Sequence, residues 1–493
     1  VAEAIEVLSA AAALPFPLDE RTEIDEGKRL QHRYLDLRRP RMQANLVNRS
    51  KVVATMRRTM DQLGFLEVET PTLIASTPEG ARDFLVPSRL SPGEFYALPQ
   101  SPQLFKQLLM IAGVERYYQV ARCYRDEDFR ADRQIEFTQL DFEGAFWGQE
   151  DVLAVLEQVM VAVVGEVRGV QLETPFRRLS YAEAMARYGT DKPDVRFAME
   201  LVNLDTVLAA TGFTAFAGVL DDGGSVGGIN AGALGLSRSG LDAQVERAKV
   251  LGAKGLVWMV VEPDGSLRSP VAKFLDETEL VALATALRAT PGDHLLLVAD
   301  RPRVVATVLG QLRLDHGRPE GHDDLCPLFV TDFPVFEVEE DGSLVPAHHP
   351  FSAPVSVEAM RDTPETALAQ AYDLVLNGVE LGSGSVRIHD PQVQAAVFEV
   401  LGIDAETAQR RFGWFLEALR YGTPPHAGFA IGIDRLVSVL QDEPNIRQVM
   451  PFPKTQTGAD PLTGSPSPVD PGQLDELGIS IRSMVGSSEP AGE

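Results

Sequence analysis

The sequence predicts an α+β fold with more than one domain. Its 493 residues are too many for a single hydrophobic core. Two stretches have the pattern of antiparallel strand pairs, one over residues 117–144 and one around Asn377-Gly378, a strong hairpin turn. Elsewhere apolar residues recur at helical spacing, as over residues 44–63 and 149–170. Strand pairs and helices in separate runs are typical of the α+β class.

The composition is that of an ordinary soluble protein. Hydrophobic residues make up 44% of the chain, and no apolar run approaches the roughly 20 residues that cross a bilayer. Cys123 and Cys326 lie far apart, which fits a reducing cytoplasm and excludes a cysteine-rich zinc module. The net charge of −26 argues against a general coat for nucleic acid. The basic residues within 27–43 leave room for a local RNA-binding patch.

The strand pair over residues 117–144 carries a polar face. Side chains alternate across a strand, so one face holds Phe137, Gln139, Asp141 and Glu143. Leu140 and Phe142 point the other way. Burying such charges without partners would cost several kcal/mol each, so this face is either solvated or the floor of a polar pocket. The hairpin alone favours the pocket only slightly.

The start of the chain predicts a linker, a helix and a strand. Residues 1–26 contain prolines and acids, which are typical of a hinge. Residues 27–62 have a helical pattern, and Gly64 suits the residue that closes the helix. The strand over residues 65–71 ends at Pro71, because proline cannot donate to a strand ladder.

Two segments between this strand and the hairpin could meet a ligand. The loop over residues 76–84 contains Glu79 and is either an inert connection or a lid. The next helix is predicted to have Ser101 as its N-cap and Pro102 at its first position. Gln103 and Lys106 are three residues apart, so they would share a face near the positive end of the helix. That is a place for an anion, although a lone lysine there is usually solvated.

Residues 196–326 differ in character from their surroundings. They are rich in glycine and contain strands of their own, so we predict an inserted domain of mixed α/β type. Its glycine run suits tight turns and lacks the context of a phosphate loop.

The histidine pair at His348 and His349 is predicted to lie on a strand. Adjacent strand residues face opposite sides, so the two imidazoles would not serve one metal, and one of them would face a polar pocket.

Charged residues gather around the second hairpin and the last strand. Asp373 and Glu380 flank the turn, either as Mg²⁺ ligands or as part of surface ion pairs. Arg387 lies beyond them and could clamp a carboxylate with its planar guanidinium. A strand over residues 429–433 leads into a helix with Arg435 in its first turn, where the helix dipole disfavours a cation and a phosphate partner is expected.

These pieces, in this order, resemble the class II aminoacyl-tRNA synthetases. Pro71 after a long helix matches the first motif, Arg125 and Glu127 match the Arg-x-Glu of the second, and the glycine-containing strand with Arg435 matches the third. Within the class, TPEGARDF, CYRDEDFRADRQIEFTQLD, ELGSGSVRIH and GFAIGIDR resemble the bacterial aspartyl-tRNA synthetases. The resemblance implies a central antiparallel sheet flanked by helices.

The resemblance also implies a domain order. It gives a hinge after an N-terminal anticodon-binding OB-fold that this sequence lacks, a split catalytic domain around a GAD-like insertion, and a partly disordered extension: residues 1–26, 27–195, 196–326, 327–459 and 460–493.

Roles for the matched residues follow from the same resemblance. ATP would be bound by Arg125, Asp126, Glu127, Gln134, Phe137, Glu380, Gly432, Ile433, Asp434 and Arg435. Aspartate would be bound by Glu79, Ser101, Gln103, Lys106, Arg125, Asp141, His348 and Arg387. Glu380 and Asp373 would hold Mg²⁺, Pro71 would lie at a homodimer interface, and Arg125, Glu127 and Arg435 would be the catalytic residues.

The implied activity is the ATP-dependent activation of L-aspartate in the cytoplasm and its transfer to the 3′ end of tRNA(Asp). The motifs leave open whether tRNA(Asn) is a second acceptor. Two alternatives stand beside this hypothesis: an asparaginyl or tRNA-independent ligase of the same fold, and a regulator with a decayed site. Lys106 with Arg387 favours an acidic substrate, and the intact charges of Arg125, Glu127, Glu380 and Arg435 argue against decay.

Overall fold

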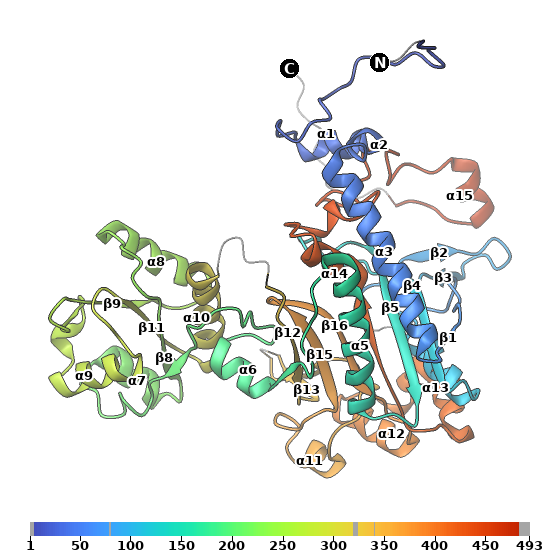
Figure 1. Cartoon of the computed structure of the whole chain (residues 1–493). Coiled ribbons are helices and arrows are strands. Elements are labelled where there is room, and N and C mark those ends of the chain that lie inside the picture. Colours follow the sequence, from blue (N-terminus) through green and yellow to red (C-terminus); the bar gives the residue numbers. More distant parts are fainter. Residues whose placement is uncertain (1–3, 78–79, 319–323, 340, 483–493) are drawn as a thin grey trace.

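The computed structural model describes residues 4–77, 80–318, 324–339 and 341–482. Within these ranges the strands form one sheet of eight strands, one of five and two of two. The five-stranded sheet and its helices form a lobe that projects from a larger body built on the eight-stranded sheet (Figure 1). Each part has its own buried core. The predicted α+β class is confirmed.

The eight-stranded sheet is antiparallel except at its edges, where β1 lies parallel to β4 and β6 parallel to β12. In spatial order its strands are β1 (Leu66–Glu67), β4 (Arg116–Tyr124), β5 (Glu136–Ala145), β17 (His426–Gly432), β16 (Val379–Val386), β15 (Ala371–Leu376), β12 (Pro327–Thr331) and β6 (Arg177–Ser180). The implied central antiparallel sheet is therefore present. The predicted strand over residues 65–71 is only two residues long, and Pro71 lies beyond it.

The β4–β5 hairpin has the predicted alternation. Cys123 pairs with Phe137, and Gln119 pairs with Asp141. Leu140 and Phe142 are fully buried in the core, so the polar face lies on the other side of the sheet. The predicted β15–β16 turn is also present, with positive φ at both Asn377 and Gly378, as a two-residue I′ turn requires.

Helices cover the apolar face of this sheet. They are α3 (Pro40–Gln62), α5 (Gln149–Arg168) and α14 (Ile433–Leu440), and α3 and α5 lie side by side in Figure 1. Their buried side chains share one core with Leu140 and Phe142. The opposite face, which carries the polar side chains, is left open for the site.

The predicted helical region over residues 27–62 is broken into three helices. Short helices α1 (Glu26–Gln31) and α2 (Arg33–Asp36) precede α3, and Gly64 follows it with a φ of +76°. Helix α4 (Gln103–Ile111) starts one residue later than predicted, with Pro102 as its N-cap. The Ser101 hydroxyl still accepts a hydrogen bond from the backbone N–H of Gln103 at 3.2 Å.

The body contains further short elements. They are β2 (Leu85–Pro87), β3 (Phe95–Ala97), α6 (Tyr181–Tyr188), β13 (Phe336–Val338), β14 (Leu344–Pro346), α11 (Val357–Asp362), α12 (Pro391–Val400), α13 (Ala405–Ala418), η2 (Leu419–Tyr421) and η3 (Ile446–Gln448). The tail was predicted to be a partly disordered extension, and its described part contains helix α15 (Pro471–Leu477). Residues 483–493 lie outside the described ranges.

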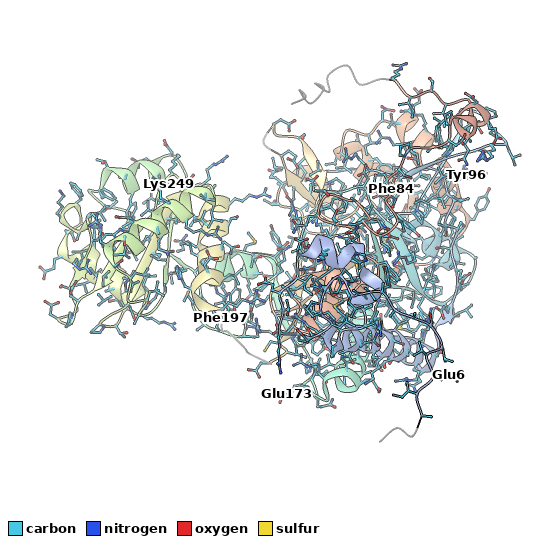
Figure 2. The ribbon with its side chains drawn as sticks, turned by 90° about the horizontal axis from the view of Figure 1, so that it is seen from above. Glu6, Phe84, Tyr96, Glu173, Phe197 and Lys249 are labelled. Atoms are coloured by element: carbon cyan, nitrogen blue, oxygen red, sulfur yellow. The ribbon has the colours of Figure 1, made fainter. Side chains whose placement is uncertain are left out.

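The lobe is built on an antiparallel sheet in the order β10 (Leu267–Arg268), β9 (Val257–Val261), β11 (His294–Asp300), β8 (Ser225–Asn230) and β7 (Val202–Asn203). Its helices are α7 (Thr214–Asp221), α8 (Arg238–Val250), α9 (Glu277–Ala286), α10 (Pro302–Gly317) and the short η1 (Ala272–Phe274). Lys249 on the lobe and Tyr96 on the body mark opposite sides of the molecule (Figure 2). The boundaries at residues 196 and 326 remain predictions.

The glycine run of the lobe has two structural roles rather than one. Gly223 and Gly232 have positive φ values, as expected for turns. Gly227 and Gly228 instead lie inside β8, where a Cβ on Gly227 would come within 2.7 Å of the Val305 side chain on α10. Those two positions allow a helix to approach the sheet closely, which the turn prediction missed.

No helix among the described residues is both long enough and apolar enough to cross a membrane.

Candidate active site

The polar face of the β4–β5 hairpin forms the floor of a cavity of about 360 Å³. The cavity is lined by α4, the two hairpins, the segment around His348 and the junction of β17 and α14. The structure brings most of the predicted site residues together there: Ser101, Gln103, Lys106, Arg125, Glu127, Gln134, Phe137, Asp141, His348, Glu380, Arg387, Gly432, Asp434 and Arg435. The alternative of a solvated sheet face is therefore wrong.

Some predicted site residues are placed elsewhere. Ile433 is fully buried in the core, and Pro71 is an exposed residue after β1. Asp126 pairs with Arg82 across 3.5 Å outside the cavity lining. Glu79 lies outside the described residues.

One end of the cavity is a buried cluster of two cations and two carboxylates. Lys106 Nζ lies 2.7 Å from Asp141 Oδ1 and 3.1 Å from Glu143 Oε2. Arg387 donates from Nε to Glu143 Oε1 at 2.9 Å and from Nη1 to Ser385 Oγ at 2.8 Å. Glu143 therefore holds both cations, and each cation keeps N–H donors beyond those bonds.

Burial and neighbouring charges shift the pKa values of the two carboxylates of this cluster in opposite directions. Burial alone would raise the pKa of Glu143, but Arg387 and Lys106 outweigh it and lower that pKa to about 2. Burial raises the pKa of Asp141 above its ordinary value, against the opposing effect of Lys106. Asp141 Oδ2 is buried and has no hydrogen-bond partner among the described residues. It is therefore a free acceptor beside two cations.

The two histidines do not behave as predicted. They follow β14 in a segment without strand structure, and both line the cavity, because no strand alternation separates them. His349 Nδ1 accepts from the Phe351 N–H at 3.3 Å, which leaves Nε2 as a donor without a partner in the described chain. Burial lowers the pKa of His348 to about 4 and that of His349 to about 3, so both imidazoles are neutral at pH 7.

The other end of the cavity carries an arginine without a counter-charge. Of the four arginines that line the cavity, Arg133 pairs with Glu127, Arg387 with Glu143, and Arg435 with Asp132 and Glu380. Arg125 has no carboxylate within 4 Å in the part of the chain that the structure describes. Its guanidinium lies 5.0 Å from the centre of the Phe137 ring. This end suits an anion and an aromatic ring.

Of the two predicted Mg²⁺ ligands, Glu380 lines the cavity and Asp373 does not. Asp373 is buried, and its Oδ1 has no hydrogen-bond partner among the described residues. Burial, then the charges of Glu380 and Asp191, raise its pKa well above the ordinary value. Carboxylate oxygens left uncompensated in this way are the ligands that Mg²⁺ prefers. Arg435 and Lys192 approach Glu380 at 3.6 and 3.5 Å and neutralise part of this charge.

Asp434 lines the cavity but is already engaged. Its carboxylate accepts from Arg49 Nη1 at 2.6 Å and from the Thr138 N–H at 2.9 Å. It therefore ties α14 to α3 and β5 rather than offering free oxygens to a ligand.

Sequence reasoning missed several residues of the site. Glu143 was placed on the polar face but given no role, and Asp132, Arg133 and Ile446 were not singled out although they line the cavity. The alternation of β5 was the available signal for Glu143. No local signal marks Ile446, because it reaches the cavity only through tertiary packing.

Comparison with known proteins was consistent with this geometry. Residues 25–456 match the family model described as tRNA synthetases class II (D, K and N). Two relatives named aspartate–tRNA(Asp/Asn) ligase, from Bacillus cytotoxicus and Bacillus cereus, are each 52% identical over 485 residues, or 97% of this chain and 82% of theirs.

Two solved structures share the fold. An asparaginyl-tRNA synthetase from Entamoeba histolytica matches with a TM-score of 0.51 at 18% identity, over 88% of this chain and 72% of that one. One from Pyrococcus horikoshii matches with a TM-score of 0.52 at 19% identity, over 91% and 77%. Both are complexes with asparaginyl-adenylate. With the family model covering most of its length, this chain belongs to the class II tRNA synthetases of the D, K and N group.

Proposed function

We propose that the protein activates L-aspartate with ATP and transfers it to the 3′ end of tRNA(Asp). The observation that carries this proposal is the buried cluster of Lys106, Asp141, Glu143 and Arg387. Its spare N–H donors match the side-chain carboxylate of aspartate, and the free Asp141 Oδ2 matches the ammonium group. Asparagine would leave the two cations facing a neutral amide, which disfavours it.

Other cavity residues complete the amino-acid site. Ser101 and Gln103 at the start of α4 line the cavity, and the buried Nε2 of Gln103 is a donor without a hydrogen-bond partner among the described residues. The His348 and His349 imidazoles close the site as neutral groups, and the His349 Nε2–H donates toward the substrate. Glu79, which lies outside the described residues, stays a predicted ligand of aspartate.

The nucleotide takes the opposite end. Arg125 binds the α-phosphate, since it is the cavity arginine without a carboxylate partner in the described chain. Phe137 and Arg435 hold the adenine ring between them, Glu127 accepts from its amino group, and Gln134 and Gly432 border it. Arg435 also faces the γ-phosphate. Asp373 and Glu380 would hold Mg²⁺, which would supply positive charge against the phosphates.

The reaction needs positioning rather than a protein nucleophile. An α-carboxylate oxygen of aspartate attacks the α-phosphorus, and the bond to pyrophosphate breaks. Arg125 and Arg435 stabilise the charge on the phosphate oxygens as this happens. The 3′ hydroxyl of the terminal ribose then attacks the carbonyl carbon of the adenylate, and AMP leaves.

Acceptor range and assembly extend the proposal. The relatives are named for both tRNA(Asp) and tRNA(Asn), which supports a second acceptor for this chain.

We place the reaction in the cytoplasm, in a homodimer that joins around Pro71, where Leu66 and Leu73 are 57% and 52% exposed. The molar mass by light scattering tests the dimer, and a mass of one chain at micromolar concentration would refute it.

Aspartate-dependent exchange of pyrophosphate into ATP tests the activity. We expect exchange with aspartate and little with asparagine. Arg387→Ala should raise the KM for aspartate by about 100-fold, because it removes a charged two-bond contact worth about 3 kcal/mol. Arg247→Ala, which removes an exposed ion pair on the lobe, is the control and should change nothing. A preference for asparagine would overturn the proposed function.

A further inference from the structure

Some of the basic residues of the region over 27–43 turn inward rather than toward solvent. Arg33 is only 2% exposed and Arg39 only 7% exposed, and both approach the fully buried Asp36. Arg29 also binds Asp36, from Nε at 2.8 Å and from Nη2 at 3.0 Å. Three arginines of the run are thus gathered around one internal carboxylate, whereas Lys28, Arg38 and Arg41 of the same run are exposed.

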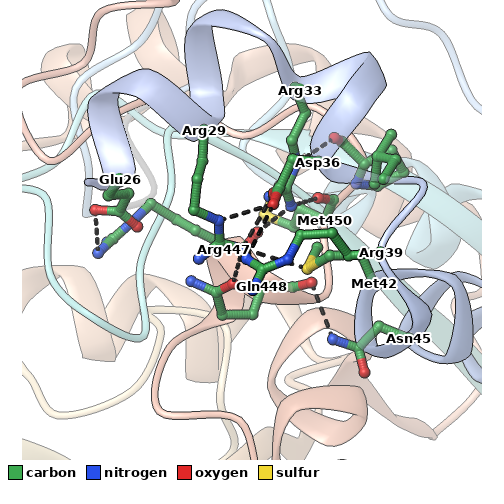
Figure 3. Close-up of polar contacts among 12 residues, drawn as sticks. Glu26, Arg29, Arg33, Asp36, Arg39, Met42, Asn45, Arg447, Gln448 and Met450 are labelled. Atoms are coloured by element: carbon green, nitrogen blue, oxygen red, sulfur yellow. Dashed lines mark hydrogen bonds and ion pairs between the residues drawn. The ribbon is translucent and has the colours of Figure 1, made fainter. Parts of the chain in front are cut away.

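Arg33 ties this cluster to the chain that follows α14. Its Nη1 donates to Asp36 Oδ2 at 2.6 Å, while Nε and Nη2 donate to three backbone carbonyls. The acceptors are Pro451 O at 2.9 Å, Arg447 O at 2.8 Å and Met450 O at 2.8 Å. One guanidinium therefore fixes the backbone of residues 447–451, as Figure 3 shows from the side of α1 and α2.

Neighbouring side chains also form hydrogen bonds to the segment of residues 447–451. Arg29 Nη2 donates to Gln448 Oε1 at 2.9 Å, and Asn45 Nδ2 donates to Gln448 O at 3.2 Å. Arg447 donates from Nε to Glu26 Oε1 at 2.8 Å (Figure 3). The start of the chain thus binds residues 447–451 from α1, α2 and α3.

The residues on either side of this segment contact the nucleotide end of the cavity or its β4–β5 loop. Ile446, directly before it, lines the cavity and donates its N–H to Ala131 O at 3.0 Å. Beyond it, Lys454 N donates to Gln134 Oε1 at 2.9 Å, and Gln134 Nε2 donates back to Lys454 O at 3.2 Å. The loop between β4 and β5 is therefore held at two points, by Ile446 before this segment and by Lys454 after it.

We propose that Arg33 is a positioning residue for the nucleotide: through residues 446–454 it fixes Ile446 and the β4–β5 loop that carries Asp132, Arg133 and Gln134. The inference rests on the proposed function, because it assigns this end of the cavity to ATP. It predicts an effect on the nucleotide and not on the amino acid. The aspartate cluster lies on α4, β5 and β16 and makes no contact with Arg33 among the described bonds.

Arg33→Lys is the test, because lysine keeps the charge but cannot bind one carboxylate and three carbonyls at once. The matched control is Arg313→Lys on α10 of the lobe. Arg313 is likewise fully buried and donates to the carbonyls of Asp194, Phe197, Ala198 and Met199. Both variants lose a comparable set of internal hydrogen bonds, but Arg33 binds the carbonyl of Arg447, directly after the cavity residue Ile446, whereas none of the residues that Arg313 binds adjoins a residue that lines the cavity.

The readouts are the KM for ATP and the KM for aspartate in pyrophosphate exchange. We expect Arg33→Lys to raise the KM for ATP about tenfold and to leave the KM for aspartate within twofold. Arg313→Lys should change neither. Hydrogen exchange should also speed up in peptides covering residues 128–136 and 444–455 of Arg33→Lys only.

Equal changes in both KM values, or no change with a folded protein, would overturn the inference. If Arg33→Lys does not fold, Arg29→Gln takes its place, because Arg29 is partly exposed and contacts Asp36 and Gln448; it should shift the same KM in the same direction. Wild-type exchange is measured in parallel. Its absence would count against the proposed function, whereas normal wild-type exchange with an unchanged ATP response in the variants counts against Arg33 alone.

Discussion

Glu143 is the residue that orients the two cations of the candidate site. It binds Arg387 across 244 positions of sequence and Lys106 from a different element. The sequence predicted both cations and the polar face of β5, because strand alternation is local. It did not predict that Glu143 would hold the cations, because that contact depends on β16 lying two strands away from β5.

The histidines show the same limit at closer range. The prediction that His348 and His349 face opposite ways assumed a strand, and β14 ends at Pro346. Beyond the end of the strand, the local pattern no longer determines the direction of either imidazole, and both line the cavity.

His349 makes stability depend on pH in a defined window. Its folded pKa of about 3 is below the ordinary value near 6.5, so the unfolded chain takes up the proton first as the pH falls below 6.5. Stability is then lost between pH 6.5 and 3 and is unaffected above that range. Replacing His349 by Gln should shrink the loss of unfolding free energy between pH 7 and pH 5 by about 1 to 2 kcal/mol.

Urea unfolding of wild type and variant at both pH values measures this difference. His389→Gln, at an exposed position, is the control. The same pH dependence in wild type and in the His349 variant would contradict the assignment.

At the scale of elements, some strands of the site follow from local sequence signals, whereas others depend on contacts with distant parts of the chain. The Asn377-Gly378 turn and the β5 alternation were predictable because both depend on neighbouring residues. The break between α1 and α2 was not, because Arg33 is placed by its bonds to Asp36 and to the backbone of residues 447–451 rather than by helix propensity. The short β1 was likewise overpredicted as seven residues.

Gly428 on β17 packs directly against Glu143 of the candidate site. A Cβ at this position would collide with the Phe142 carbonyl and with the carboxylate of Glu143. Gly428→Ala should therefore displace Glu143 and lower kcat/KM for aspartate by at least tenfold in the exchange assay. Gly218→Ala on α7, where an added Cβ meets nothing within 4 Å, is the matched control.

The control should keep full activity and be neutral or slightly more stable, since alanine favours a helix over glycine by about 1 kcal/mol. Full activity of Gly428→Ala would mean that Glu143 can shift without loosening Arg387 and Lys106.

At the scale of the whole molecule, the sequence predicted a body and an inserted part, and the structure contains a second sheet with its own core in that region. The basic run over residues 27–43 was predicted less well, because Arg33 and Arg39 are buried while Arg38 and Arg41 are exposed. Charge counting favoured an outward patch, but folding turned Arg33 and Arg39 toward Asp36 and away from solvent. A count of charges cannot say which of them find a partner inside.

The central claim is that one cavity joins ATP and aspartate, with the aspartate side chain on Lys106 and Arg387. A crystal structure with a non-hydrolysable aspartyl-adenylate analogue tests it most directly. We expect the side-chain carboxylate of the analogue to lie within hydrogen-bond distance of Arg387 and Lys106. Its ammonium group should contact Asp141 Oδ2, and its α-phosphate mimic should contact Arg125. An analogue bound with its ammonium toward Arg387, or bound outside this cavity, would contradict it.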